Sequence, residues 1–160
     1  MAPDPARQLL RHAVATVAYR GDKALRGAPA EFATFRAGES SRTPVEILAH
    51  VGDLLDWAAA LCEGRHVWRN AAPGSWEGEA GRFFDGLRRL DEALAADAPL
   101  GFPAEKLFQG PVADALTHIG QIAMLRRLAG SPVKGENYFK AKIQAGQVGP
   151  EQAAARVEFD

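Results

Sequence analysis

The sequence predicts an all-α protein folded as a four-helix bundle. Apolar residues recur every three or four positions along four long segments, which is the period of a helix rather than of a strand. The segments are separated by proline, glycine and cap residues. The length of 160 residues suits a single domain. We therefore expect residues 1–160 to form one helical-bundle domain.

The first helix is expected to begin at Pro5, with Asp4 as its N-cap, and to end near Gly21 or Gly27. Its expected buried face comprises Leu9, Leu10, Ala13, Val14 and Val17.

A long connection is expected over residues 26–42, which contain glycine and serine and show no helical period. Phe32 and Phe35 are its expected anchors.

The second helix has the clearest start signal. Thr43 is the expected N-cap, Pro44 takes the first helical position and Glu46 completes a capping box. Gly64 is the expected stop. The apolar face between them comprises Ile47, Leu48, Val51, Leu54, Leu55, Ala58 and Leu61.

The third helix is expected to follow Ser75 and to end before the proline-containing segment 98–110. Its apolar face comprises Phe83, Phe84, Leu87, Leu90 and Leu94. The fourth helix is expected from Pro111 to Gly130. The chain after it is expected to be irregular, apart from a short helix starting at Pro150.

Charge and composition narrow the class of partner. The 19 basic and 20 acidic residues give a net charge of −1, which does not favour nucleic acid or an anionic membrane. Cys62 is the only cysteine, so a cysteine-rich zinc site is excluded. No leader or spanning segment is evident. We expect a cytoplasmic protein acting on a small molecule.

Three polar residues on the apolar helices predict a metal site. Asp114 and His118 are four positions apart, about one helical turn, so both side chains point from one face. His50 lies in the second helix and supplies a third ligand if the two helices pack together. Two alternatives stay open: Asp114 as a carboxylate in the first turn of its helix, and His50 as a hydrogen-bonded core residue.

Gln121 lies three residues after His118 on nearly the same face. From there its amide can hydrogen-bond a ligand or a metal-bound water, so we expect it beside the site, although it serves equally well to satisfy a buried backbone group.

The segments ILAHVGDLLDW and DALTHIGQIAMLRRLAG resemble the DinB superfamily, whose relatives include YfiT-like proteins and mycothiol-dependent maleylpyruvate isomerase. The resemblance implies a bundle whose metal ligands are a histidine of the second helix, here His50, and two residues of the last helix. His118, before Ile119-Gly120-Gln121, matches the second of these. Asp114 stands where histidine is common, as in the His-carboxylate-His set of the isomerase branch.

The resemblance also implies a function. It suggests a divalent-metal-dependent enzyme, with zinc, nickel, iron or manganese, that uses a low-molecular-weight thiol for S-transfer or isomerisation, and a homodimer. It does not assign catalytic residues beyond the metal ligands. The alternative is a non-catalytic, metal-binding or stress-associated dimeric bundle that kept the scaffold.

Overall fold

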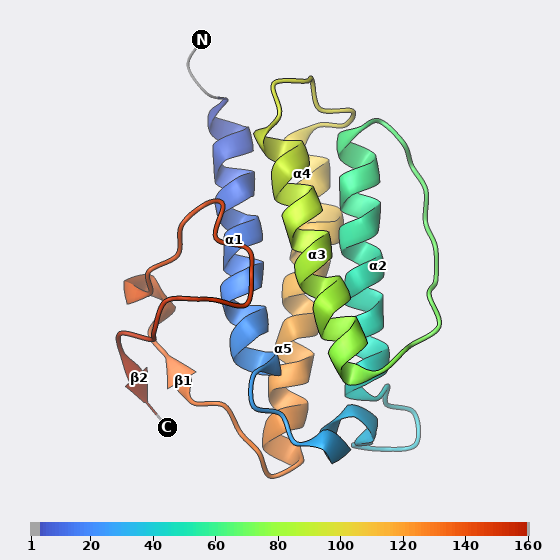
Figure 1. Cartoon of the computed structure of the whole chain (residues 1–160), viewed down its shortest axis with the longest axis vertical. Helices are drawn as coiled ribbons and strands as arrows, with labels where there is room; N and C mark the ends of the chain where they lie inside the picture. The colour runs from blue at the N-terminus through green and yellow to red at the C-terminus, as the bar shows by residue number, and fades with distance from the viewer. Residues whose placement is uncertain (1–3, 160) are drawn as a thin grey trace.

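Four long helices lie side by side in the computed structural model, which describes residues 4–159 (Figure 1). The first three are α1 (Pro5–Leu25), α2 (Pro44–Cys62) and α3 (Trp76–Ala95). The fourth column consists of α4 (Ala104–Leu107), the π-helix η2 (Phe108–Val112) and α5 (Ala113–Leu128). The predicted all-α bundle is confirmed. No helix among residues 4–159 has the length and apolarity needed to cross a membrane.

Local capping explains where the first three helices begin. Asp4 and Ser75 each accept a hydrogen bond from a backbone N–H of the following turn. Thr43 and Glu46 form both hydrogen bonds of the capping box. Each cap satisfies amides that the helix itself leaves unpaired. The three predicted starts are therefore confirmed.

The core forms where the apolar stripes of the helices meet. Its most deeply buried side chains include Val14, Leu48, Phe83 and Leu87, which are fully buried. Leu9 was expected to join them, and this prediction is wrong because its side chain is 71% exposed. The buried stripe of α1 instead follows Leu10, Val14 and Val17, which places the neighbouring Leu9 at its edge.

The connection between α1 and α2 contains a short 3-10 helix, η1 (Ala30–Thr34). Phe32 is its buried anchor, as predicted, and packs edge-on against Trp76 with ring centroids 5.6 Å apart. Phe35 is partly buried against the core.

The last helix begins earlier than the sequence predicts. The backbone is already helical at Leu107 and Val112, so the helix runs continuously from Ala104 through Pro111. Proline lacks an N–H and its ring crowds the preceding turn, which is why Pro111 resembled a first helical residue. The wider π turn of η2 accommodates it. The predicted start at Pro111 is therefore wrong.

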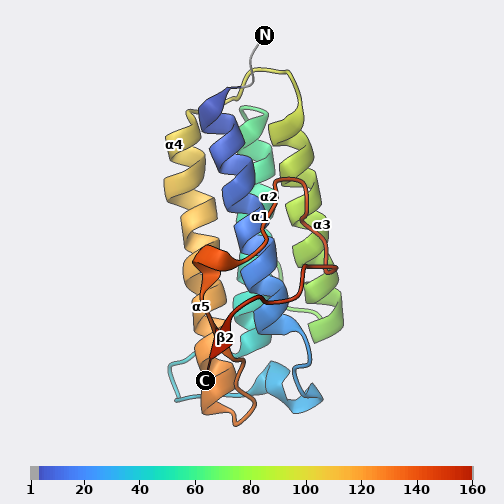
Figure 2. The same cartoon turned by 90° about the vertical axis from the view of Figure 1, so that its left-hand side faces the viewer.

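The C-terminal segment is irregular, as predicted, and crosses α1 (Figure 2). It contains the 3-10 helix η3 (Tyr138–Lys140) and a two-stranded antiparallel ladder between β1 (Gly135–Glu136) and β2 (Glu158–Phe159). The short helix predicted from Pro150 is wrong, because residues 151–155 adopt no regular structure. After this stretch the chain pairs as β2 with β1.

A buried polar cluster attaches this segment to α1. The Tyr19 hydroxyl donates to the carboxylate of Glu136 at 2.5 Å, and Lys23 Nζ donates to the same carboxylate at 2.7 Å. Glu136 is itself buried, so the two donors compensate the cost of removing its charge from water.

Candidate metal centre

His50, Asp114 and His118 converge where α2 packs beside α5. Each offers one donor atom, and these three atoms all lie within 4.8 Å of one another. His50 and Asp114 are far apart in the sequence, and the packing of α2 beside α5 brings them together. Asp114 and His118 lie on one face of the same helix. The structure thus brings together all three residues that the sequence proposed as ligands.

The separations are close to those of a bound ion. Asp114 Oδ2 lies 3.7 Å from His50 Nε2, whereas the 3.2 Å separation between Asp114 Oδ1 and His118 involves Nδ1, the ring nitrogen that faces the backbone. The two imidazole centroids are 4.6 Å apart. Donor atoms ~2.0–2.2 Å from a tetrahedral ion lie about 3.4 Å from each other. The 3.7 Å separation is near this value, and the three donor atoms all lie within 4.8 Å of one another.

The backbone orients one of the imidazoles. His118 Nδ1 lies 2.8 Å from the carbonyl oxygen of Asp114. A carbonyl only accepts hydrogen bonds, so Nδ1 carries the proton and Nε2 keeps its lone pair. Metal-binding histidines commonly use their second nitrogen in this way.

His50 is held in its neutral form. Burial lowers the pKa of the His50 imidazole, and the nearby charges of His118 and Arg42 act in the same direction. The carboxylates of Asp114 and Asp53 oppose this shift without overcoming it. A neutral imidazole near pH 7 has a free lone pair, which is the form that binds metal.

The structure argues against the alternative that Asp114 is only a carboxylate at the start of its helix. Asp114 lies ten residues after Ala104, deep within the continuous helix, instead of in its first turn. The backbone at Val112 is helical, and no side chain caps α5 there. A helix-terminal role therefore does not account for this carboxylate.

The structure also argues against the alternative that His50 is a hydrogen-bonded core residue. Within residues 4–159, the His50 side chain forms no hydrogen bond, and its nearest charged partner is the Asp114 carboxylate. Its side chain is 21% exposed and is not sealed in the core. It is thus not a core histidine satisfied by hydrogen bonds.

An aromatic wall covers the other side of His50. Trp68, from the loop between α2 and α3, packs edge-on against the imidazole with centroids 5.7 Å apart. Trp57 packs against Trp68 and stacks on His66. Trp68 was not predicted to lie beside His50, because a loop residue has no periodic spacing to a residue on a helix.

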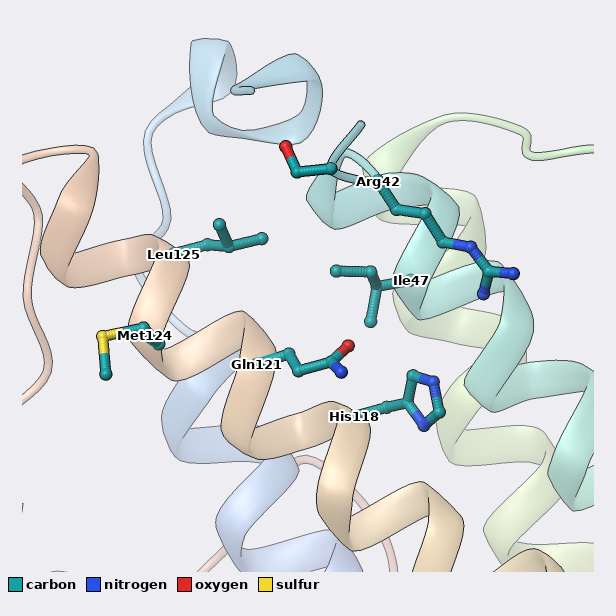
Figure 3. A pocket seen from close by; sticks show the side chains of 7 residues that line it. Arg42, Ile47, His118, Gln121, Met124 and Leu125 are labelled. Atoms are coloured by element: carbon teal, nitrogen blue, oxygen red, sulfur yellow. The ribbon is translucent and has the colours of Figure 1, made fainter. Parts of the chain in front are cut away.

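A cavity of about 540 Å³ adjoins His118 (Figure 3). Its lining comprises Ser41, Arg42, Ile47, His118, Gln121, Met124 and Leu125. Gln121 points into this space, one turn along α5 from His118 (Figure 3). Its side chain forms no hydrogen bond to the three proposed ligands in the described part of the chain. Its expected role beside the site stays a prediction.

Comparison of the chain with protein-family models, with curated proteins and with solved structures finds no match. The resemblance to the DinB superfamily therefore stays a prediction.

Proposed function

We propose that this protein is a divalent-metal-dependent enzyme acting on a small molecule, with the ion held by His50, Asp114 and His118. The observation that carries the proposal is the convergence of these three donors from two helices beside a cavity. Two imidazoles and one carboxylate suit zinc, nickel, iron or manganese.

The arrangement fits a catalytic site better than a structural one. Structural zinc sites use four protein ligands, whereas catalytic sites use three and leave a position open. A divalent ion held there supplies Lewis acidity to a water, thiol or carbonyl group. The protein's part is to orient His118 through the Asp114 carbonyl, to keep His50 neutral and to shield it with Trp68.

The reaction class is proposed by analogy with the family that the sequence resembles. It is an S-transfer or isomerisation that uses a low-molecular-weight thiol, in a cytoplasmic homodimer. The non-catalytic alternative requires a site closed by side chains. The cavity beside His118 and the 45% exposure of the Asp114 side chain favour the enzyme.

Elemental analysis of untagged protein, purified without chelator, tests the proposal. We expect about one divalent ion per chain, lost in His50→Ala, Asp114→Ala and His118→Ala. His12→Ala and Asp85→Ala remove the same side-chain types from exposed positions and should retain the ion. Circular dichroism checks that each variant is folded. A metal-free wild type, or folded ligand variants that keep the ion, would overturn the proposal.

A further inference from the structure

Arg42 is an exposed arginine at the cavity beside His118, and its guanidinium has no protein partner among residues 4–159. Arg11, Arg82 and Arg126 each bind carboxylates or carbonyl oxygens. Within residues 4–159, Arg42 forms neither a side-chain hydrogen bond nor an ion pair, although it lines the cavity beside His118. The cavity thus has an available positive charge.

The connection that carries Arg42 is held in place by other residues. Arg36 donates to the carbonyl oxygen of Ser41, and the Ser41 hydroxyl donates to the carbonyl oxygen of Gly38. The next residue, Thr43, is fixed in the capping box of α2. Because its neighbours are ordered in this way, the backbone of Arg42 is positioned without help from its own side chain.

Apolar side chains line the cavity together with Arg42 and the proposed metal ligand His118. Ile47 and Leu125 form a largely buried wall, and Met124 adds a more exposed one. In Figure 3 the Arg42 side chain starts at the N-terminal end of α2 and runs along that helix, with Ile47 beside it and His118 below it on α5. A ligand that fills this space is in reach of a metal donor, apolar side chains and a cation.

We propose that Arg42 binds a carboxylate of the molecule that reacts at the metal centre, so that the site selects small anionic ligands with an apolar body. This inference rests on the proposed function, since it needs the ion at His50, Asp114 and His118. A guanidinium presents a planar pair of N–H donors that matches the two oxygens of a carboxylate. Arg42 is a specificity residue and takes no part in the metal site itself.

The test uses cobalt(II)-loaded protein and two thiol probes, 3-mercaptopropionate and 3-mercaptopropanamide. The probes share length and thiol and differ in charge, and a sulfur-to-cobalt absorption band reports the binding of either one. We expect wild type to prefer the carboxylate by about 5-fold, the scale of a partly exposed ion pair. In Arg42→Gln the preference should vanish, while Arg42→Lys should keep part of it.

Arg127→Gln is the matched control, because Arg127 is exposed, lies outside the cavity lining and carries the same charge. It should preserve the preference. Cobalt content measured on each sample separates the two proposals. An equal preference in wild type and Arg42→Gln, with cobalt bound in both, would overturn only the role of Arg42. Failure of wild type to bind cobalt would overturn the metal-centre proposal and this one together, whereas bound cobalt that neither thiol reaches would overturn this inference alone.

Discussion

The Nδ1 atom of His118 lies 2.8 Å from the backbone carbonyl oxygen of Asp114, one helical turn before it. Asp114 therefore contributes to the site through both its backbone and its side chain. Its backbone fixes the imidazole so that Nε2 holds the lone pair, and its carboxylate lies 3.7 Å from His50 Nε2. The two residues act as a unit because a single turn of α5 positions both.

Substitution of Asp114 separates the contribution of its backbone carbonyl from that of its carboxylate. Asp114→Asn keeps the backbone carbonyl but removes the negative charge, so metal affinity should fall by more than the 10- to 100-fold typical of residues that only support a ligand. Competition with a chromophoric chelator measures the affinity. The nitrogen chemical shifts of His118 should still report a proton on Nδ1.

Asp85→Asn is the control for this change, since Asp85 is exposed on α3, away from the site. Unchanged affinity in Asp114→Asn would show that the carboxylate is not a ligand.

The pKa of His50 predicts a pH dependence of stability in the metal-free protein. Burial lowers this pKa in the folded state, with His118 and Arg42 adding to the effect, while the unfolded chain keeps a value of about 6.5. The stabilising contribution is thus complete above about pH 6.5 and is lost as the pH falls through the folded-state pKa. Urea unfolding at about pH 7.5 and pH 5.5 should show a smaller loss in His50→Gln than in wild type.

Exposed His12 offers the matching comparison, and His12→Gln should lose as much stability on acidification as wild type. Equal losses in wild type and His50→Gln would contradict the lowered pKa.

Two glycines should respond in opposite ways to alanine. A Cβ atom at Gly21 would clash with the ring of Phe83, in the core between α1 and α3. A Cβ atom at Gly120 meets nothing within 4 Å. Gly21→Ala should lower the free energy of unfolding by ~1–3 kcal/mol, and Gly120→Ala should raise it by up to about 1 kcal/mol. Urea unfolding of both variants measures the contrast. A stabilised Gly21→Ala would show that α1 and α3 are packed less closely than the structure has them.

Glu136 should be the residue that holds the C-terminal segment in place. Its carboxylate accepts from Tyr19 and Lys23, and burial together with this carboxylate raises the pKa of Tyr19. Glu136→Ala leaves the Tyr19 hydroxyl without its acceptor and Lys23 with Glu158 alone, and should cost ~3 kcal/mol of stability, whereas Tyr19→Phe should cost about 1 kcal/mol.

Limited proteolysis measures the local effect of the same changes. Cleavage after residue 132 should accelerate in Glu136→Ala and stay slow in a Glu151→Ala control, because Glu151 is exposed. Equal cleavage rates would place the attachment elsewhere.

The sequence predicted those features that depend on local interactions. Capping at Asp4, Thr43 and Ser75 involves atoms within three residues, so the three helix starts could be identified directly. The pairing of Asp114 with His118 follows from helical geometry alone. The convergence with His50 needed the further expectation that α2 and α5 pack together.

Features set by tertiary contacts were missed. Pro111 marks a helix start by local rules, but η2 widens there, and Gly110 lies where an added Cβ would approach Trp57 of α2. The alanine-rich stretch after Pro150 favours a helix, yet β2 pairs with β1 instead. Trp68 and Arg42 reach the site from loops, for which the sequence has no period.

Anomalous diffraction from a crystal of the zinc-loaded protein tests the central claim most directly. The account predicts one strong peak ~2.0–2.2 Å from Nε2 of His118, a ring nitrogen of His50 and a carboxylate oxygen of Asp114. No peak between α2 and α5, or a peak that lies beyond bonding distance of any one of these three side chains, would contradict it.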